Sequence, residues 1–359
     1  MKTPQIPQLK TIFLLGCFLL VSLATYAQVP VPFTVRYERN LKGDMTLISN
    51  GIVNRQTNSD GPNVPYNETG NSSEYNDNLS MQYIDIDGDP STFSSSSASL
   101  LLPASGCNKI VYAGLYWSAT YRFNNGFSTS PGDGDNVREN DFNQVRLKLP
   151  GGAYQNITGQ LIFDGFTNPD FIANSPYACY ADITSLVTGL TNPEGEYTVA
   201  NIRATQGQIN GGGVSGGWTI FFVYENPTMT GKYITAYDGF AGVRATIGQT
   251  DINYSGFTTL PPPFPVRAKL ASAALEGDNR ITGDQLLFRA ASNATFTALG
   301  NTLNATNNFF NSRLTLNNVD FTDRVPNSLN TLGYDGDIMT VANPLNSVIP
   351  NNETAATLR

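Results

Sequence analysis

The sequence contains no histidine. This absence excludes Ser-His-Asp catalytic triads, histidine-ligated zinc and histidine general bases. Charged residues are also scarce, at 14% of the chain, and acidic residues outnumber basic ones, so that the formal net charge is −8. Because nucleic acid and anionic membrane surfaces attract basic chains, we expect neither as a partner.

Apolar runs long enough to span a membrane are absent too. The apolar run at residues 11–23 is shorter than the ~20 residues that a spanning helix needs. It follows Lys2 and Lys10 and precedes a small-residue cleavage site that ends at Ala27, which is the pattern of a secretory signal. We therefore predict that residues 1–27 are a cleavable signal peptide, that the protein is secreted or exposed at the cell surface, and that no transmembrane segment remains after cleavage.

Cysteine is rare, with three residues in the chain. Cys17 lies inside the apolar N-terminal run, where the sequence Leu-Leu-Gly-Cys resembles a lipoprotein cleavage site. A lipid anchor there would leave an apolar segment at the mature N-terminus, which disfavours this alternative. Cys107 and Cys179 remain as an even pair, and in an exported chain an even count favours a Cys107–Cys179 disulfide. The alternative is two buried free thiols, because bonding requires Cα atoms within about 7 Å.

Helical periodicity does not extend over more than about three turns anywhere in the chain. Instead, short runs of apolar and β-branched residues alternate with clusters of Gly, Pro and Asn. We predict an all-β protein, with a jelly-roll or sandwich-like β domain that carries long polar loops, and one short helix over Tyr180–Leu190. The predicted strands are Asp44–Ser49, Ser99–Leu102, Lys109–Tyr116, Gln144–Leu149, Gln160–Phe163, Glu196–Ile202, Trp218–Tyr224 and Lys232–Tyr237.

The proline-rich segment 260–265 is typical of an extended connector. It divides the mature chain into an N-terminal β-sandwich domain, residues 28–260, and a second β region, residues 261–359. The last residues, from Thr354 to Arg359, resemble the beginning of a strand. We therefore expect that the second region is truncated and that the sequence is an N-terminal fragment of a longer protein.

An acidic motif stands out at residues 85–90, where Asp85, Asp87 and Asp89 alternate around Gly88. Carboxylates at alternate positions project to one side of an extended backbone, and hard oxygen ligands suit Ca²⁺. We therefore predict a Ca²⁺ site at these three aspartates, although position 12 of an EF-hand loop would be Ser96 here instead of glutamate. The alternative is a solvated acidic turn. Two shorter pairs repeat the pattern at Asp133/Asp135 and Asp335/Asp337.

Catalysis without histidine remains open to paired carboxylates, as in glycoside hydrolases. Glu225, Asp238 and Glu276 follow or lie in apolar strand-like segments and are the residues that such a hydrolase would use. The sequence does not place any two of them at the ~5 to 9 Å separation that the chemistry requires. We therefore predict a protein that is not an enzyme, with no catalytic residues, and keep a histidine-free polysaccharide hydrolase as the alternative.

Aromatic residues are frequent, with 17 tyrosines and 20 phenylalanines. Exposed aromatic rings serve as platforms for sugars, and Tyr116, Trp117, Tyr121 and Phe123 are the residues that could form such a surface. The alternative is that they pack in the core, because the residues before Trp117 form a strong strand pattern.

Four stretches together resemble a known group of proteins. They are Val111–Trp117, Ala181–Val187, Gly216–Pro227 and Ile234–Phe240, of which the third, Gly-Gly-Trp-Thr-Ile-Phe-Phe-Val-Tyr-Glu-Asn-Pro, is the most specific. They are similar to the N-terminal region of large Bacteroidetes cell-surface proteins of the adhesin or gliding-motility type. The resemblance implies export by type IX secretion and downstream repeats and a sorting domain, which this sequence lacks; it implies no catalytic residues.

These observations converge on a non-catalytic extracellular module of a large bacterial surface protein. We predict that it serves adhesion through recognition of an extracellular glycan or a surface protein, by loops on a rigid β scaffold. A structural spacer that only separates other domains from the membrane is a further alternative.

Overall fold

The computed structural model describes residues 30–56, 60–69, 75–127, 134–209, 212–243 and 248–359. The predicted signal peptide lies outside these residues. Strands make up 47% of the described residues and helices 4%, so the fold is all-β, as the sequence predicts. Within the described ranges no helix is long and apolar enough to cross a membrane. The helical elements are single turns: η1 (Asn76–Asn78), α1 (Thr184–Thr188) and η2 (Pro344–Asn346).

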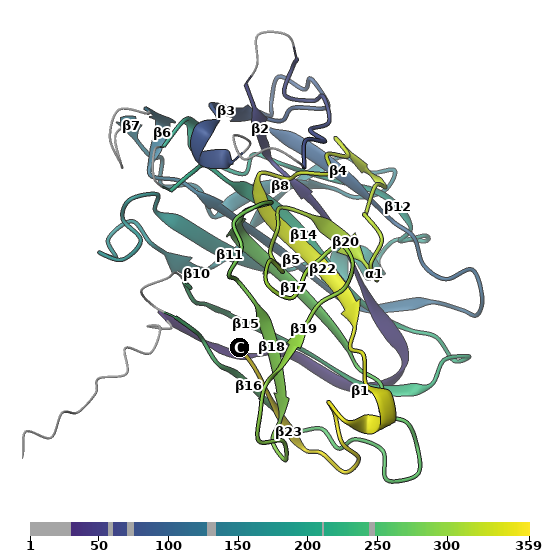
Figure 1. Ribbon diagram of the computed structural model, residues 1–359. Coiled ribbons are helices and arrows are strands. Elements are labelled where there is room, and N and C mark those ends of the chain that lie inside the picture. Colours follow the sequence, from purple (N-terminus) through teal and green to yellow (C-terminus); the bar gives the residue numbers. More distant parts are fainter. Residues whose placement is uncertain (1–29, 57–59, 70–74, 128–133, 210–211, 244–247) are drawn as a thin grey trace, which may run out of the picture.

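A six-stranded antiparallel sheet forms the largest layer (Figure 1). Its first strand, β1, is long and changes partner along its length: residues 43–51 pair with β14, and residues 31–42 pair with β15. Two register shifts in the N-terminal part of β1, between Val31 and Tyr37, bend the strand, as β-bulges do. In spatial order the strands are β10 (Gln160–Asp164), β11 (Pro176–Asp182), β5 (Lys109–Thr120), β14 (Gly216–Glu225), β1 (Val31–Gly51) and β15 (Gly231–Phe240).

A second sheet packs on the first and completes the sandwich. Tyr197 and Phe222, one from each sheet, contact each other with ring centroids 5.6 Å apart. The indole N–H of Trp218 donates to Ser96 Oγ of the second sheet at 2.8 Å, which satisfies the polar atom of a buried side chain. In spatial order its strands are β21 (Arg324–Val325), β4 (Ser95–Leu100), β12 (Gly195–Ala200), β8 (Gln144–Lys148) and β9 (Tyr154–Thr158).

A third, smaller sheet continues from the end of β1 at one end of the sandwich (Figure 1). It includes one parallel pair, between β13 and β6. Gly207 has φ +80°, and a Cβ there would lie 2.5 Å from the carbonyl oxygen of Gly126, so the close approach of these strands requires glycine. Its strands are β2 (Val53–Arg55), β3 (Met81–Tyr83), β13 (Gln206–Gly207), β6 (Phe123–Gly126) and β7 (Gly134–Val137).

Two further sheets come mainly from the C-terminal third and cover part of the outer face of the six-stranded sheet (Figure 1). Lys269 Nζ lies 2.7 Å from Asp44 Oδ2 of β1, and Tyr334 OH lies 3.1 Å from Thr219 Oγ1 of β14. One sheet has the strands β16 (Ile252–Ser255), β23 (Ala355–Leu358), β18 (Leu286–Ala290) and β19 (Thr297–Leu299), and the other β17 (Lys269–Gly277), β22 (Gly333–Thr340) and β20 (Leu314–Leu316).

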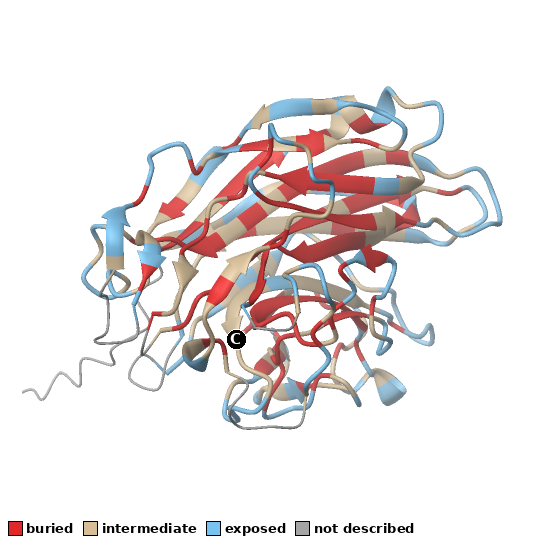
Figure 2. Cartoon of the chain, turned by 90° about the horizontal axis from the view of Figure 1, so that it is seen from above, coloured by how far each residue is buried: buried red, intermediate tan, exposed pale blue. Residues whose placement is uncertain are grey.

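Buried residues form two main clusters (Figure 2). The larger lies inside the sandwich and includes Trp117 and Trp218, whereas the smaller lies between the C-terminal sheets around Phe288 and Phe309. Strand pairing crosses the predicted boundary at residue 260, because β16 pairs with β23 and β4 pairs with β21. Strands from both parts therefore lie in the same sheets, and the division into two regions stays a prediction.

Two local predictions differ from the structure. The predicted helix over Tyr180–Leu190 is wrong in its first part, because Tyr180 belongs to β11 and α1 covers five residues. The predicted Cys107–Cys179 disulfide is not formed: Cys107 is exposed, Cys179 is buried, and both are free. Cys179 pairs with Trp117 in β5, while Cys107 precedes the start of that strand at Lys109. About 26 Å of extended strand therefore separates the two residues, well beyond the reach of a disulfide.

Candidate functional site

The predicted Ca²⁺ ligands lie in an exposed turn, residues 85–90, which we call the acidic turn. Gly88 has φ +59°, a left-handed conformation that glycine adopts at no steric cost. Asp85 Oδ1 accepts a hydrogen bond from Ser95 Oγ at 2.9 Å, and Asp87 Oδ1 accepts one from the amide of Asp89 at 3.0 Å. Asp89 Oδ1 accepts two, from the amide and the hydroxyl of Ser91 at 2.8 and 2.7 Å.

These hydrogen bonds stabilise the charged carboxylates. Burial opposes the charged form of Asp87, but hydrogen bonds from Tyr154, from the Asp89 amide and from Thr92 lower its pKa. Hydrogen bonds from the Ser91 hydroxyl and amide lower the pKa of Asp89. Within the described ranges no three or more Cys, Asp or Glu side chains are grouped to hold a metal ion. The Ca²⁺ site at Asp85, Asp87 and Asp89 stays a prediction.

The two shorter aspartate pairs have different positions. Asp133 lies outside the described residues, so the first pair is not placed. Asp335 and Asp337 are buried in β22, with 3% and 4% of their surface exposed, instead of lying in a turn. Burial raises the pKa of Asp335 to about 8 and that of Asp337 to about 6, because the charged form loses its hydration.

Two of the three carboxylates of the hydrolase alternative, Glu225 and Asp238, lie far apart. Glu225 pairs in register with Gly43 of β1, and Asp238 pairs with Thr34 of the same strand. Eight residues of β1 lie between these partners, so that the partners are separated by roughly 30 Å. Glu225 and Asp238 therefore cannot form a glycosidase pair, which needs a separation of about 5 to 9.5 Å.

Glu276 lies at a β-bulge in β17, between Leu275 and Gly277, and has φ +68°. Its Oε2 accepts a hydrogen bond from Nδ2 of Asn76 at 2.9 Å. The other two oxygens of this contact, Glu276 Oε1 and Asn76 Oδ1, are buried and have no hydrogen-bond partner. Burial raises the pKa of Glu276 well above its usual range, and the neighbouring Asp278 and Asp77 add to the effect. A proton on Oε1 would complete a two-point contact between a carboxylic acid and an amide.

The aromatic residues proposed as a platform divide between the core and the surface. Trp117 and Tyr121 are each 1% exposed and belong to the sandwich core, whereas Tyr116 and Phe123 are half-buried. Alternate residues of β5 point to opposite faces, so Tyr112 and Tyr116 lie on the outer face of the sheet. The platform prediction is therefore wrong for Trp117 and Tyr121.

Neighbouring strands add further aromatic rings to this outer face. Tyr116 contacts Tyr180 and Phe221, with ring centroids 4.8 and 5.7 Å away, and Tyr37 stacks on Tyr112 at 4.5 Å. All five residues lie on β1, β5, β11 or β14. The outer face thus carries a continuous set of tyrosines and a phenylalanine, held in place by the sheet.

An ion pair lies at the edge of this aromatic cluster, in which Tyr112 and Tyr180 are buried, with 4% and 6% of their surface exposed. Arg36 donates two hydrogen bonds to Asp238, from Nε at 2.6 Å and from Nη2 at 3.0 Å, in the bidentate geometry that favours arginine. The hydrogen bond to Asp238 is the main cause that raises the pKa of Arg36. The guanidinium also lies over the ring of Tyr180, 4.4 Å from its centroid, and Nη1 donates to Gln160 at 3.2 Å. The carboxylate of Asp238 is therefore held by Arg36 in an ion pair.

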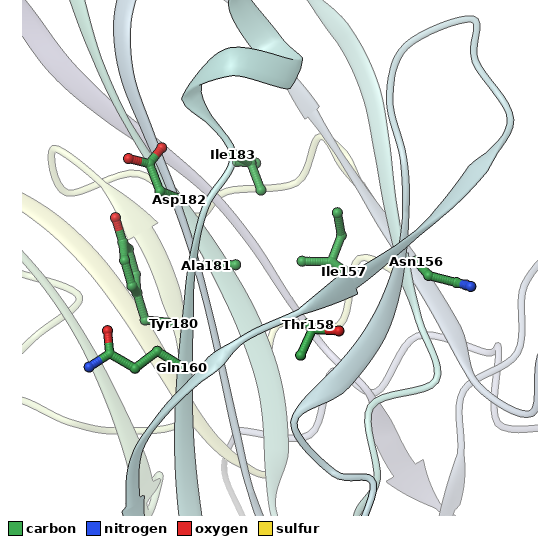
Figure 3. Close-up of a pocket in the computed structure, with 8 residues that line it drawn as sticks. All are labelled: Asn156, Ile157, Thr158, Gln160, Tyr180, Ala181, Asp182 and Ile183. Carbon is green, nitrogen blue, oxygen red and sulfur yellow. The ribbon is translucent and has the colours of Figure 1, made fainter.

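Next to this ion pair the sandwich opens into a shallow cleft of about 390 Å³ between β9 and β11, which we call the edge cleft. Figure 3 shows Ile157 turned toward Ala181 and Ile183, while Tyr180 and Gln160 project to the other side. The floor is therefore apolar. Its lining residues are Asn156, Ile157, Thr158, Gln160, Tyr180, Ala181, Asp182 and Ile183.

Polar groups rim the edge cleft. Thr158 and Asp182 are exposed, and Asp182 Oδ1 accepts the amide N–H of Thr184 at 2.8 Å, which fixes its carboxylate at the start of α1. A second hollow, of about 560 Å³, lies near the third sheet, where Arg203 is held by Asp141 and stacks on Phe93. It contains no pair of acids. The edge cleft combines an apolar floor with hydroxyl and carboxylate groups at its rim, and it is the candidate binding site.

Sequence reasoning missed the edge cleft. Thr158 and Asp182 are 24 positions apart, and no motif joins them. The predicted strand over Gln160–Phe163 was the available signal, but its edge position follows from long-range pairing. Comparison of the chain with protein-family models, curated proteins and solved structures finds no match.

Proposed function

We propose that this chain is a non-catalytic extracellular recognition module of a bacterial surface protein, and that the edge cleft binds a segment of an extracellular glycan. The proposal rests on the chemical groups that line the cleft. An apolar floor can contact the C–H face of a sugar ring, while Thr158 and Asp182 at the rim can hydrogen-bond to sugar hydroxyls.

The rigidity of the scaffold supports the same proposal. The cleft is formed by strands of two packed sheets, so a ligand there would not have to order a long loop. The bidentate contact between Arg36 and Asp238, together with the stacking of Arg36 on Tyr180, fixes one wall. Binding sites on such elements lose less conformational entropy than sites on free loops.

The extracellular location rests on the signal-like N-terminus and on the resemblance to Bacteroidetes surface proteins. Adhesion is the activity that a glycan-binding module of such a protein would serve. The hydrolase alternative is weakened because Glu225 and Asp238 lie roughly 30 Å apart along β1. A spacer without a ligand is the remaining alternative, and the experiment below separates it from recognition.

The test uses the chain without its signal segment, applied to a glycan array and to cells in an adhesion assay. We expect binding to a restricted set of glycans, and we expect Thr158→Arg to weaken it at least about tenfold, which is 1.4 kcal/mol, because the long side chain enters the cleft. Thr230→Arg changes an exposed threonine in the turn between β14 and β15 and serves as the matched control. Absence of glycan binding, or equal binding by the two variants, would contradict the proposal; adhesion without glycan binding would indicate a protein ligand.

A further inference from the structure

The segment 308–313, which we call the Asn308 loop, lies between the buried carboxyl group of Asp335 and the half-buried carboxyl group of Asp284. The amide of Phe310 donates to Asp284 Oδ2 at 2.8 Å, and the amide of Arg313 donates to Asp335 Oδ1 at 3.0 Å. The carboxylates repel each other, and this repulsion contributes to the raised pKa of Asp335. Arg313 does not neutralise them, because its guanidinium pairs with Asp320 at 3.1 Å.

Three buried oxygen atoms on and beside this loop accept no hydrogen bond of ordinary geometry: Asp335 Oδ2, Asn308 Oδ1 and Asn311 Oδ1. The backbone amides of Asn311 and Ser312 approach the carboxyl group of Asp335 and partly offset the rise in its pKa that burial causes. Their residues are 3%, 8% and 7% exposed. A buried acceptor without a partner costs about 1–3 kcal/mol, so three in one region require an explanation.

A reversed amide assignment does not remove this deficit. Asn308 Nδ2 donates to the carbonyl oxygen of Asn279 at 2.8 Å, and Asn311 Nδ2 donates to that of Leu303 at 2.7 Å. Turning either amide would place two oxygens against each other. The amide oxygens are therefore fixed as acceptors.

The backbone carbonyl of Phe310 lies in the same region, next to Gly277. A Cβ at this glycine would lie 2.2 Å from Asp335 Oδ2 and 2.6 Å from the carbonyl oxygen of Phe310, so these two oxygens are close to each other. Oxygen ligands of this kind, from carboxylates, side-chain amides and a backbone carbonyl, are those that Ca²⁺ selects. A divalent ion would also neutralise both carboxylates.

We propose that the Asn308 loop, together with Asp284 and Asp335, forms a Ca²⁺ site. The ligands are Asp335 Oδ2, the carbonyl oxygen of Phe310, the two asparagine amide oxygens and Asp284, completed by water. This site is distinct from the acidic turn and contains two carboxylates instead of three.

The test begins with the unmodified chain, without its signal segment and stripped of metal with EGTA. Calorimetric titration with CaCl₂ should show binding, and Ca²⁺ at about 100 times Kd should raise Tm by about 5 °C, because a ligand that binds only the folded state stabilises it. Absence of binding or of a Tm increase overturns the proposal, and this result does not depend on any variant.

Variants then locate the ion. Asp335→Asn and Asp284→Asn should each weaken Ca²⁺ binding at least tenfold, while Asp323→Asn, which removes one charge from an exposed position next to β21, should leave it unchanged. Asp87→Asn tests the rival position in the acidic turn. Loss of binding in Asp87→Asn with unchanged affinity in Asp335→Asn would overturn the proposal. If Asp335→Asn is instead more stable than the unmodified chain and Ca²⁺ has no effect on either, a proton occupies the site and the proposal fails.

Discussion

The acidic turn and the Asn308 loop use the same residue type in opposite ways. In the turn, Asp87 and Asp89 receive hydrogen bonds from hydroxyl and amide donors, and the pKa of each is lowered. Beside the loop, Asp335 is buried and one of its oxygens has no donor, and burial raises its pKa to about 8. The comparison teaches that burial and the supply of donors, not the spacing of aspartates in the sequence, determine which carboxyl groups need a further partner.

The largest difference between the two regions should appear on truncation. Asp335→Ala removes the acceptor of the Arg313 amide and of neighbouring loop amides, so we expect a loss of about 3 kcal/mol in the free energy of unfolding. Asp87→Ala, in the exposed turn, should cost less than about 1 kcal/mol. Urea denaturation of both variants in EGTA measures the difference. Equal losses would show that burial does not distinguish the two regions.

A second prediction concerns pH and Glu276, which lies near Asn76 and Asp77 of η1 and near Asp278, the residue after the end of β17. Its pKa in the folded chain is raised, so the folded state holds the proton more tightly than the unfolded state. The stability from this group is complete below about pH 4, the pKa of an unfolded glutamate, and is lost as pH rises toward the folded pKa.

Glu276→Gln keeps the two-point contact with Asn76 and cannot ionise. We therefore expect its stability to fall less steeply than that of the unmodified chain between pH 4 and neutrality, and Glu276→Ala to be less stable than Glu276→Gln at every pH. Thermal denaturation across this range is the measurement. Parallel curves for Glu276→Gln and the unmodified chain would mean that Glu276 is already ionised in the fold.

The smallest effect is expected in the acidic turn. Tyr154→Phe removes the hydroxyl that donates to Asp87 Oδ2. The pKa of Asp87 should rise toward its ordinary value, while the free energy of unfolding changes by only about 0.5 kcal/mol because the site is open to solvent. NMR titration of the Asp87 carboxyl measures the shift. An unchanged pKa would show that the other donors of the turn are sufficient.

Much of the local structure was predictable because it depends on local patterns. Alternation along Lys109–Tyr116 predicts a strand, and the structure extends it to Thr120 and places Trp117 inward and Tyr116 outward on it. Over Tyr180–Leu190 the same reasoning failed at its start, because pairing with β5 holds Tyr180 in a strand. Tertiary contacts override a weak helical pattern there.

The sequence by itself determined that this protein is all-β and that it has no histidine chemistry. Only the tertiary structure decided which polar groups meet. The edge cleft joins Thr158 to Asp182, and the Asn308 loop lies between Asp284 and Asp335, because strand registers bring distant segments together. The physical reason is that strand and turn patterns depend on a few adjacent residues, whereas desolvation and unpaired acceptors depend on long-range packing.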